Sequence, residues 1–172
     1  MQLKNKLDEC FRQGEKGGER HKGLKNIGLN EYLIDEHLKK AGHNLNAVTE
    51  FKNIGYSDWS ASAAFYALYH CLLALLLKFG YQSRNQTCTF AFVEDLINKK
   101  KISLKLEELK EIFDKDVIED LAHSEKILDI RENMQYSFKT SMEEEEFNKL
   151  FGRTKLLFDK IRREIEKLQE RN

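Results

Sequence analysis

Histidine is the side chain best suited to proton transfer or metal binding near neutral pH, and the chain carries five. His70 lies in an uncharged stretch, where a histidine is more often a hydrogen-bonded core residue than a catalyst. His37 and His43 lack metal-ligand spacing and have no acidic or cysteine partner in register. His123 precedes Arg131 by two helical turns, about 12 Å, which is too far to act on the same proton. We therefore expect neither a metal site nor a cofactor.

The three cysteines, Cys10, Cys71 and Cys88, are far apart and outside any CxxC spacing. An odd number at such positions indicates neither a disulfide framework nor a zinc site. The first thirteen residues have no apolar run behind their charges, so they do not resemble a secretory signal. These features predict a cytoplasmic protein.

Acidic and basic residues are equal in number, 29 of each, which removes the simplest electrostatic argument for nucleic-acid or membrane affinity. Two basic clusters are still candidates for contact with a phosphate backbone. They are Lys99 to Lys101 with Lys105, and Arg153, Lys155, Arg162 and Arg163. Because acidic residues surround most of them, solvated helix ends are the favoured interpretation.

The composition points to one all-α domain. A chain of 172 residues can build one continuous core, and the absence of proline removes the strongest helix breaker. Most glycines lie in the N-terminal third, in the string GEKGGERHKGLKNIGLN. We therefore expect residues 1–29 to form an N-terminal helical arm and flexible connector with little core, and residues 30–172 to form a helical bundle.

Apolar positions at steps of three and four predict the helices of the bundle. Asn30 is the expected N-cap of the first, and a capping box of Ser141 with Glu144 is expected to begin the last. A break is expected near Lys115 in the fourth. The expected ranges are 30–55, 57–80, 87–100, 103–135 and from 141 onward.

The nineteen residues from Trp59 to Leu77 carry no formal charge and are long enough to cross a membrane. Their serine, tyrosine and histidine side chains are costly in hydrocarbon without partners, whereas a bundle core can satisfy each of them. We therefore expect a central bundle helix and no membrane association.

The segment SDWSASAAFYALYHCLLALLLKFGYQSRNQTC resembles HEPN domains in its small residues, paired aromatics, leucine-rich half and glycine-ended helix. The upstream EYLIDEHLKKAGHNLNAV, the later DIRENMQY and the closing amphipathic helix follow in the family's order, over residues 31–168. The resemblance implies an up-and-down four-helix bundle with an additional short helix, and a homodimer. It also implies one of several functions, because many family members are metal-independent endoribonucleases, others bind or scaffold, and many accompany a nucleotidyltransferase.

Family ribonucleases carry an arginine followed a few residues later by a histidine, and Arg131 matches the arginine. Tyr136 stands at the histidine position, and no histidine follows Arg131. Metal-free RNA cleavage needs a base for the ribose 2′-OH and a cation for the phosphate oxygens. Arg131 can supply the cation. An unperturbed tyrosine, with a pKa of about 10, is only about 0.1% ionised at neutral pH, so a tyrosine at this position is a poor base.

On one continuous helix, Arg131 and Tyr136 would point about 140° apart. Either the helix ends between them, or the two-fold axis of a dimer brings Arg131 of one chain near Tyr136 of the other.

Our leading hypothesis is a homodimer that binds RNA or a partner protein, without efficient cleavage, through Arg131, Asn133, Gln135 and Tyr136. One alternative is an endoribonuclease of toxin–antitoxin or defence type, with Arg131 and Tyr136 as its catalytic residues. Another is the partner subunit of a nucleotidyltransferase.

Overall fold

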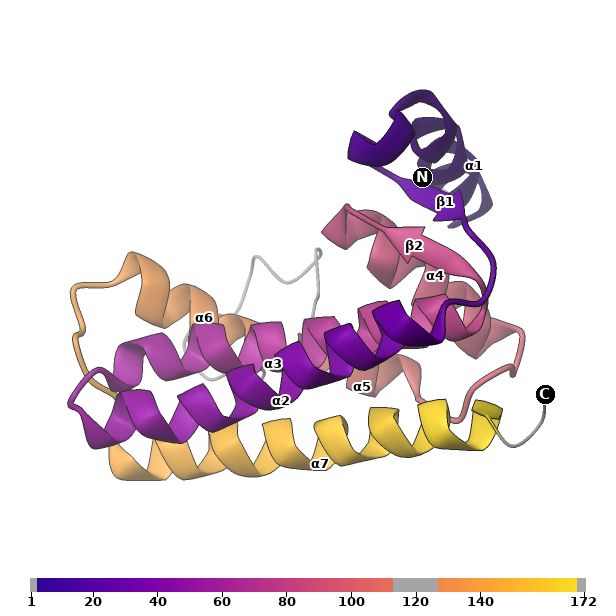
Figure 1. The fold of residues 1–172 in the computed structure, drawn as a ribbon. Helices are drawn as coiled ribbons and strands as arrows, with labels where there is room; N and C mark the ends of the chain where they lie inside the picture. Colours follow the sequence, from indigo (N-terminus) through magenta and orange to yellow (C-terminus); the bar gives the residue numbers. More distant parts are fainter. Residues whose placement is uncertain (1–2, 113–126, 170–172) are drawn as a thin grey trace.

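Helices account for nearly all of the secondary structure in the computed structural model, which describes residues 3–112 and 127–169 (Figure 1). The all-α helical bundle predicted from the sequence is confirmed, with one small antiparallel sheet added to it. The helices are α1 (Leu3–Lys16), α2 (Glu31–Asn53), α3 (Ser57–Lys78), α4 (Gln86–Asn98), α5 (Leu106–Ile112), α6 (Ile127–Tyr136) and α7 (Glu144–Gln169). A short 3₁₀ turn spans Gly18–Arg20, and the strands are β1 (Leu24–Asn26) and β2 (Tyr81–Ser83).

The most apolar helix, α3, lies at the centre of the bundle. It packs against α2, α4, α5, α6 and α7, and the long helices α2, α3 and α7 run side by side (Figure 1). α3 is the one helix of the described residues that is long and apolar enough to cross a membrane, and 78% of that window is buried inside the fold. The expected central bundle helix is therefore present.

Local signals set the helix limits. The Asn30 side chain accepts a hydrogen bond of 3.0 Å from the Leu33 N–H, so the predicted cap of α2 is confirmed. α7 begins at Glu144, later than the expected capping box, and the Met142 N–H donates instead to Ser57 Oγ at 2.7 Å. The segment before α7 is thereby tied to the first residue of α3. The break expected near Lys115 lies outside the described residues.

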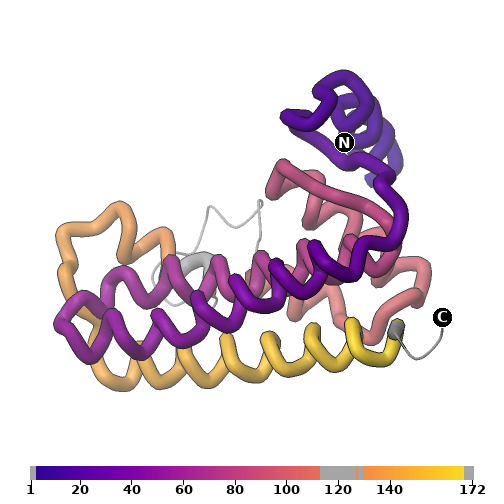
Figure 2. Tube along the Cα trace, in the orientation of Figure 1, coloured from indigo at the N-terminus to yellow at the C-terminus, as the bar shows by residue number. Residues whose placement is uncertain are grey.

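The N-terminal arm packs on the bundle, contrary to the expected flexible connector with little core. β1 pairs with β2 in antiparallel register, with Leu24 opposite Ser83, and α1 contacts α4. In Figure 2 the indigo arm accordingly lies over the pink part of the chain that follows α3. Leu7 and Leu24 are buried, and the Phe11 ring lies 5.5 Å from Tyr81 and 6.3 Å from Phe92. The arm therefore forms part of the hydrophobic core.

Two glycines explain why the arm resembled a connector. A Cβ at Gly14 would overlap the carbonyl oxygen of Leu24, and a Cβ at Gly23 would overlap that of Cys10. Only glycine allows α1 and β1 to approach so closely. Residues typical of a flexible segment therefore serve here as close-packing positions.

The expectation that the cysteines stay unpaired is wrong for two of them. Cys10 on α1 and Cys88 on α4 form a disulfide with Cα atoms 5.6 Å apart, while Cys71 is a buried free thiol. The two bonded residues are 78 positions apart, and only the docking of the arm brings them together. The cysteines therefore no longer support the prediction of a reducing compartment, and cytoplasmic location stays a prediction.

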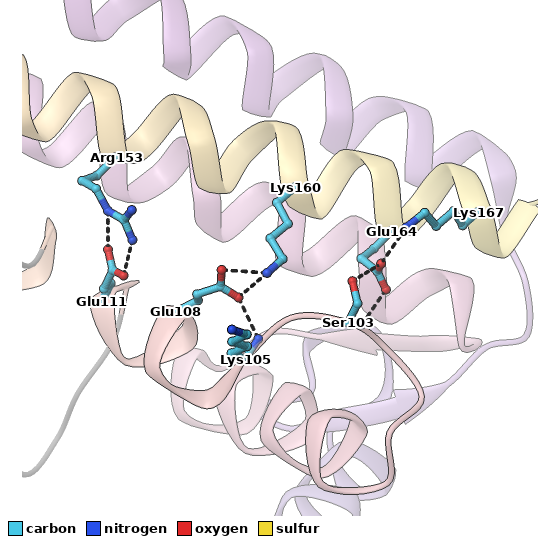
Figure 3. Close-up of polar contacts among 8 residues, drawn as sticks. All are labelled: Ser103, Lys105, Glu108, Glu111, Arg153, Lys160, Glu164 and Lys167. Carbon is cyan, nitrogen blue, oxygen red and sulfur yellow. Dashed lines mark hydrogen bonds and ion pairs between the residues drawn. The ribbon is translucent and has the colours of Figure 1, made fainter.

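Ion pairs hold α5 against α7 (Figure 3). Lys160 donates to both carboxylate oxygens of Glu108, and Arg153 pairs with Glu111 through two nitrogens. Glu164 accepts a hydrogen bond of 2.8 Å from the Ser103 N–H and a second from its hydroxyl. The loop before α5 is thus fixed to α7 by a buried carboxylate.

Reduction of the disulfide should destabilise the protein. Dithiothreitol is expected to lower the free energy of unfolding in urea by about 2–4 kcal/mol, because the bond closes a long loop of the unfolded chain. The Cys10→Ser/Cys88→Ser variant keeps only the free thiol of Cys71 and has no disulfide to reduce. Its stability should therefore be the same with and without dithiothreitol. Three reactive thiols in the unreduced, denatured wild-type protein would contradict the assignment.

Glu164 should contribute stability that depends on pH. Burial alone would raise its pKa, but the hydrogen bonds from Ser103 and the nearby Lys167 ammonium together outweigh burial and leave the pKa below its ordinary value of 4.5. A lowered pKa gives stability at neutral pH that is lost as the pH falls below that value. Glu164→Ala should cost about 1–3 kcal/mol at pH 7 by leaving the Ser103 groups unpaired, and the cost should shrink in acid. Glu166→Ala, on the exposed side of α7, is the matched control and should change stability by less than about 0.5 kcal/mol.

Candidate functional site

The predicted site residues lie on α6, which is helical from Ile127 to Tyr136 without interruption. Ile127, Ile130 and Met134 face the core. Arg131 lies at the edge of that buried face, whereas Tyr136 points away from it and is 81% exposed. The suggestion that the helix ends between Arg131 and Tyr136 is therefore wrong, and one chain does not bring the two together.

Arg131 packs against α3. Its Cζ atom lies 4.3 Å from the centre of the Phe65 ring and 5.9 Å from that of Tyr66, within the range of a cation–π interaction. Its Nε atom is buried and has no hydrogen-bond partner among the residues that the structure describes. A buried donor without an acceptor costs about 1–3 kcal/mol, so the guanidinium is held by the rings at the expense of one hydrogen bond.

Beside Arg131, α3 presents its one solvent-accessible side, which we call the α3 stripe: Trp59, Ser62, Tyr66 and His70. Steps of three and four residues place these side chains on one face of the helix. Trp59 is 57% and Tyr66 41% exposed, although nearly every other residue of α3 is buried. Large exposed aromatic side chains on such a buried helix indicate a contact surface.

His70 belongs to the stripe and is paired with a second histidine. Its Nδ1 atom lies 2.9 Å from Nδ1 of His37 on α2, a hydrogen bond in which one ring donates and the other accepts. Burial, His37 and Lys40 lower the pKa of His70 to about 4, and burial lowers that of His37. Both imidazoles are therefore neutral at pH 7. The core role expected of His70 holds in part, because its ring is hydrogen-bonded but only half-buried.

Asn133 and Gln135 are exposed on α6. Gln135 follows Arg131 by about one helical turn and lies on the same side of the helix. Asn133 flanks the buried face of α6 on the side opposite to Arg131. Phe138, just beyond the end of α6, is fully exposed. This end of α6 therefore presents two aromatic rings to solvent, those of Tyr136 and Phe138.

The basic clusters largely behave as solvated helix ends. Lys99 pairs with Asp95 at 2.7 Å, Arg162 with Glu166 at 3.5 Å, and Arg153 with Glu111. Among residues 3–112 and 127–169, no group of three or more histidine, cysteine, aspartate or glutamate side chains could hold a metal ion. Arg131 therefore stays the candidate cation for contact with a phosphate group.

Sequence reasoning missed the contact between Arg131 and the rings of α3, and the pairing of His37 with His70. The Phe65–Tyr66 pair was visible in the sequence, but which helix it would meet was not. The sequence did indicate that His70 shares a helix face with Tyr66, because the two residues are four positions apart. Nothing in the sequence placed His37 opposite that face.

The comparisons with known proteins agree with this architecture. A family model described as the HEPN domain matches residues 34–168, which include all of α3 to α6 and nearly all of α2 and α7. The search of curated proteins finds no match. The match spans most of the chain and begins after the N-terminal arm, and the chain therefore belongs to the HEPN family.

Proposed function

We propose that the protein is a homodimeric RNA-binding module that does not cleave RNA efficiently. The observation that carries this proposal is the state of Arg131, a guanidinium held on aromatic rings with one buried N–H that no described residue pairs. By turning outward to a phosphate oxygen, the side chain would gain the hydrogen bond that it lacks. The cost of leaving the rings is partly offset by that gain.

The α3 stripe supplies the dimer contact in this proposal. Trp59 and Tyr66 are large, exposed and in line along a helix that is otherwise buried. A two-fold axis through the stripe would cover these rings with the same rings of a second chain. It would also bring Arg131, next to Tyr66, to the edge of a groove shared by the two chains.

The end of α6 supplies the contact with bases. Tyr136 and Phe138 are exposed and carry rings on which unpaired bases can stack, an interaction of about 1–3 kcal/mol per base. Because Tyr136 points away from Arg131 within a chain, the partner's Tyr136 is the ring expected near Arg131. Single-stranded RNA fits such a groove better than a duplex, whose bases are already stacked.

The absence of an efficient base supports binding without turnover. Tyr136 occupies the position of the family's histidine, and a phenol is mostly protonated at neutral pH. It can donate a hydrogen bond to a phosphate but cannot readily accept the 2′-OH proton. A protein partner on the same surface, including a nucleotidyltransferase, is the competing possibility, and RNA binding distinguishes the two.

Replacing Arg131 should weaken RNA binding without unfolding the protein. Arg131→Ala is expected to raise the Kd for a labelled single-stranded RNA about tenfold or more, since a hydrogen bond to a charged group contributes roughly 1.5–3 kcal/mol. The dependence of log Kd on log salt should also fall by about one unit. Fluorescence anisotropy at several salt concentrations measures both effects.

Arg163→Ala, which removes the same charge from the exposed side of α7, is the matched control and should bind RNA like the wild type.

Trp59→Glu should give a monomer by light scattering, because it places two like charges at the two-fold axis. The proposal fails if the wild-type protein is monomeric and Arg131→Ala leaves RNA binding unchanged. No RNA binding together with retained binding of a nucleotidyltransferase through Arg131 would favour the partner-subunit alternative.

A second candidate function is metal-independent RNA cleavage, and the His37–His70 pair favours it. His70 follows Tyr66 by one turn on the α3 stripe, about 6 Å along the axis from the ring that Arg131 approaches. Its Nδ1 is occupied by His37, and its Nε2 has no hydrogen bond to a described residue. In the tautomer in which the His70 Nδ1–H donates to His37, Nε2 carries the free lone pair and can accept a 2′-OH proton.

Restoring the family's histidine separates binding from catalysis. Tyr136→His is expected to gain RNA cleavage in EDTA that leaves 2′,3′-cyclic phosphate ends, because an imidazole of pKa near 6.5 is a competent base. The wild type should show little or none. Substantial wild-type cleavage that is lost in His70→Gln but kept in His43→Gln would instead establish the second candidate, since His43 is exposed on α2 away from the pair.

A further inference from the structure

A cavity of about 490 Å³ lies between the N-terminal arm and the bundle, away from Arg131. Leu7 and Phe11 of α1 line one side of it. Phe79, Tyr81 and Phe92 line the other, at the end of α3, on β2 and on α4. This volume falls in the range of pockets that hold small molecules.

The walls of this arm cavity are fixed in place by several independent contacts. The Cys10–Cys88 disulfide joins α1 to α4 beside it, and the β1–β2 pairing joins the arm to the end of α3. The Phe11, Tyr81 and Phe92 rings contact one another, with Tyr81 and Phe92 4.8 Å apart. The cavity is therefore formed in the folded protein before any ligand enters.

The floor of the arm cavity is apolar. Its side chains are leucines and aromatic rings, and among them only Tyr81 carries a polar atom. A nucleobase placed there would leave several hydrogen-bonding groups unpaired, which disfavours its binding. A hydrocarbon or an unsubstituted aromatic body has no such groups and gains from burial.

The rim of the arm cavity carries an excess of positive charge. Lys99 is paired with Asp95 at 2.7 Å, which leaves Lys4, Lys101 and Asp8 on the rim. Neither Lys4 nor Lys101 forms an ion pair with a described residue. Two ammonium groups against one carboxylate around an apolar floor match a ligand with an apolar body and one anionic head.

We propose that the arm cavity binds a small amphipathic carboxylate, whose apolar body lies on the Phe11, Tyr81 and Phe92 floor while its head pairs with Lys4 and Lys101. Four of the eleven lining residues come from α1, which lies outside the part of the chain matched by the HEPN model. The arm thus gives this chain a ligand site that the bundle alone does not contain.

Decanoate is a suitable probe, with isothermal titration calorimetry as the measurement. The expected result is saturable binding of one decanoate per chain. Acetate should bind much more weakly because it lacks an apolar body. AMP should also bind much more weakly, because the floor offers too few hydrogen-bond partners for its base. Lys4→Gln and Lys101→Gln should each weaken decanoate binding about twofold to fivefold, the effect of removing one exposed ion pair. Asp8→Lys should strengthen it, an effect that loss of folding cannot produce.

The matched controls are Lys6→Gln on α1 and Lys100→Gln beside Lys101, because neither residue lines the arm cavity. Both should bind decanoate like the wild type. The proposal is overturned if decanoate does not bind saturably, if the rim variants behave like the controls, or if AMP binds more tightly than decanoate and competes with it. Thermal unfolding of each variant in the absence of ligand shows whether a change in binding reflects a change in folding.

Discussion

The burial of α3 is the constraint on which the rest of the structure depends. A helix that is apolar on nearly every side is stable in water only if other helices cover it, and five of them do so here. These helices leave one side of α3 accessible to solvent, and the exposed residues of α3 lie along that side. The α3 stripe is therefore a direct consequence of how the central helix is covered.

The same burial determines where Arg131 can go. α6 lies on α3 with Ile127, Ile130 and Met134 turned inward, and helix geometry then puts Arg131 at the edge of the contact. Phe65 and Tyr66 lie beneath it and accept the guanidinium on their faces. Tyr136, five residues on, is turned outward by the same geometry, so its separation from Arg131 is built into the packing of α6.

The bundle was predictable because its signals are local. The N-cap Asn30 and the apolar seam of α7 both act within a few turns of helix, and the structure has them where the sequence indicates. The arm was mispredicted because its packing depends on Gly14 and Gly23, where the required property is the absence of a side chain. The disulfide and the His37–His70 pair join distant residues, and a single sequence carries no signal for such pairs.

The candidate site, like the fold, was predictable only in part. Arg131 and Tyr136 were found from their family positions, but the rings beside Arg131 come from α3, which approaches α6 only in the folded chain. The 140° between them holds because α6 is continuous, so one chain cannot direct both side chains at one phosphate. A groove that uses both must take them from two chains, and the exposed rings of the α3 stripe supply the surface on which two chains can meet. In the proposed dimer, the RNA-binding groove forms only when two chains meet, so RNA affinity should depend on protein concentration wherever the dimer is only partly formed.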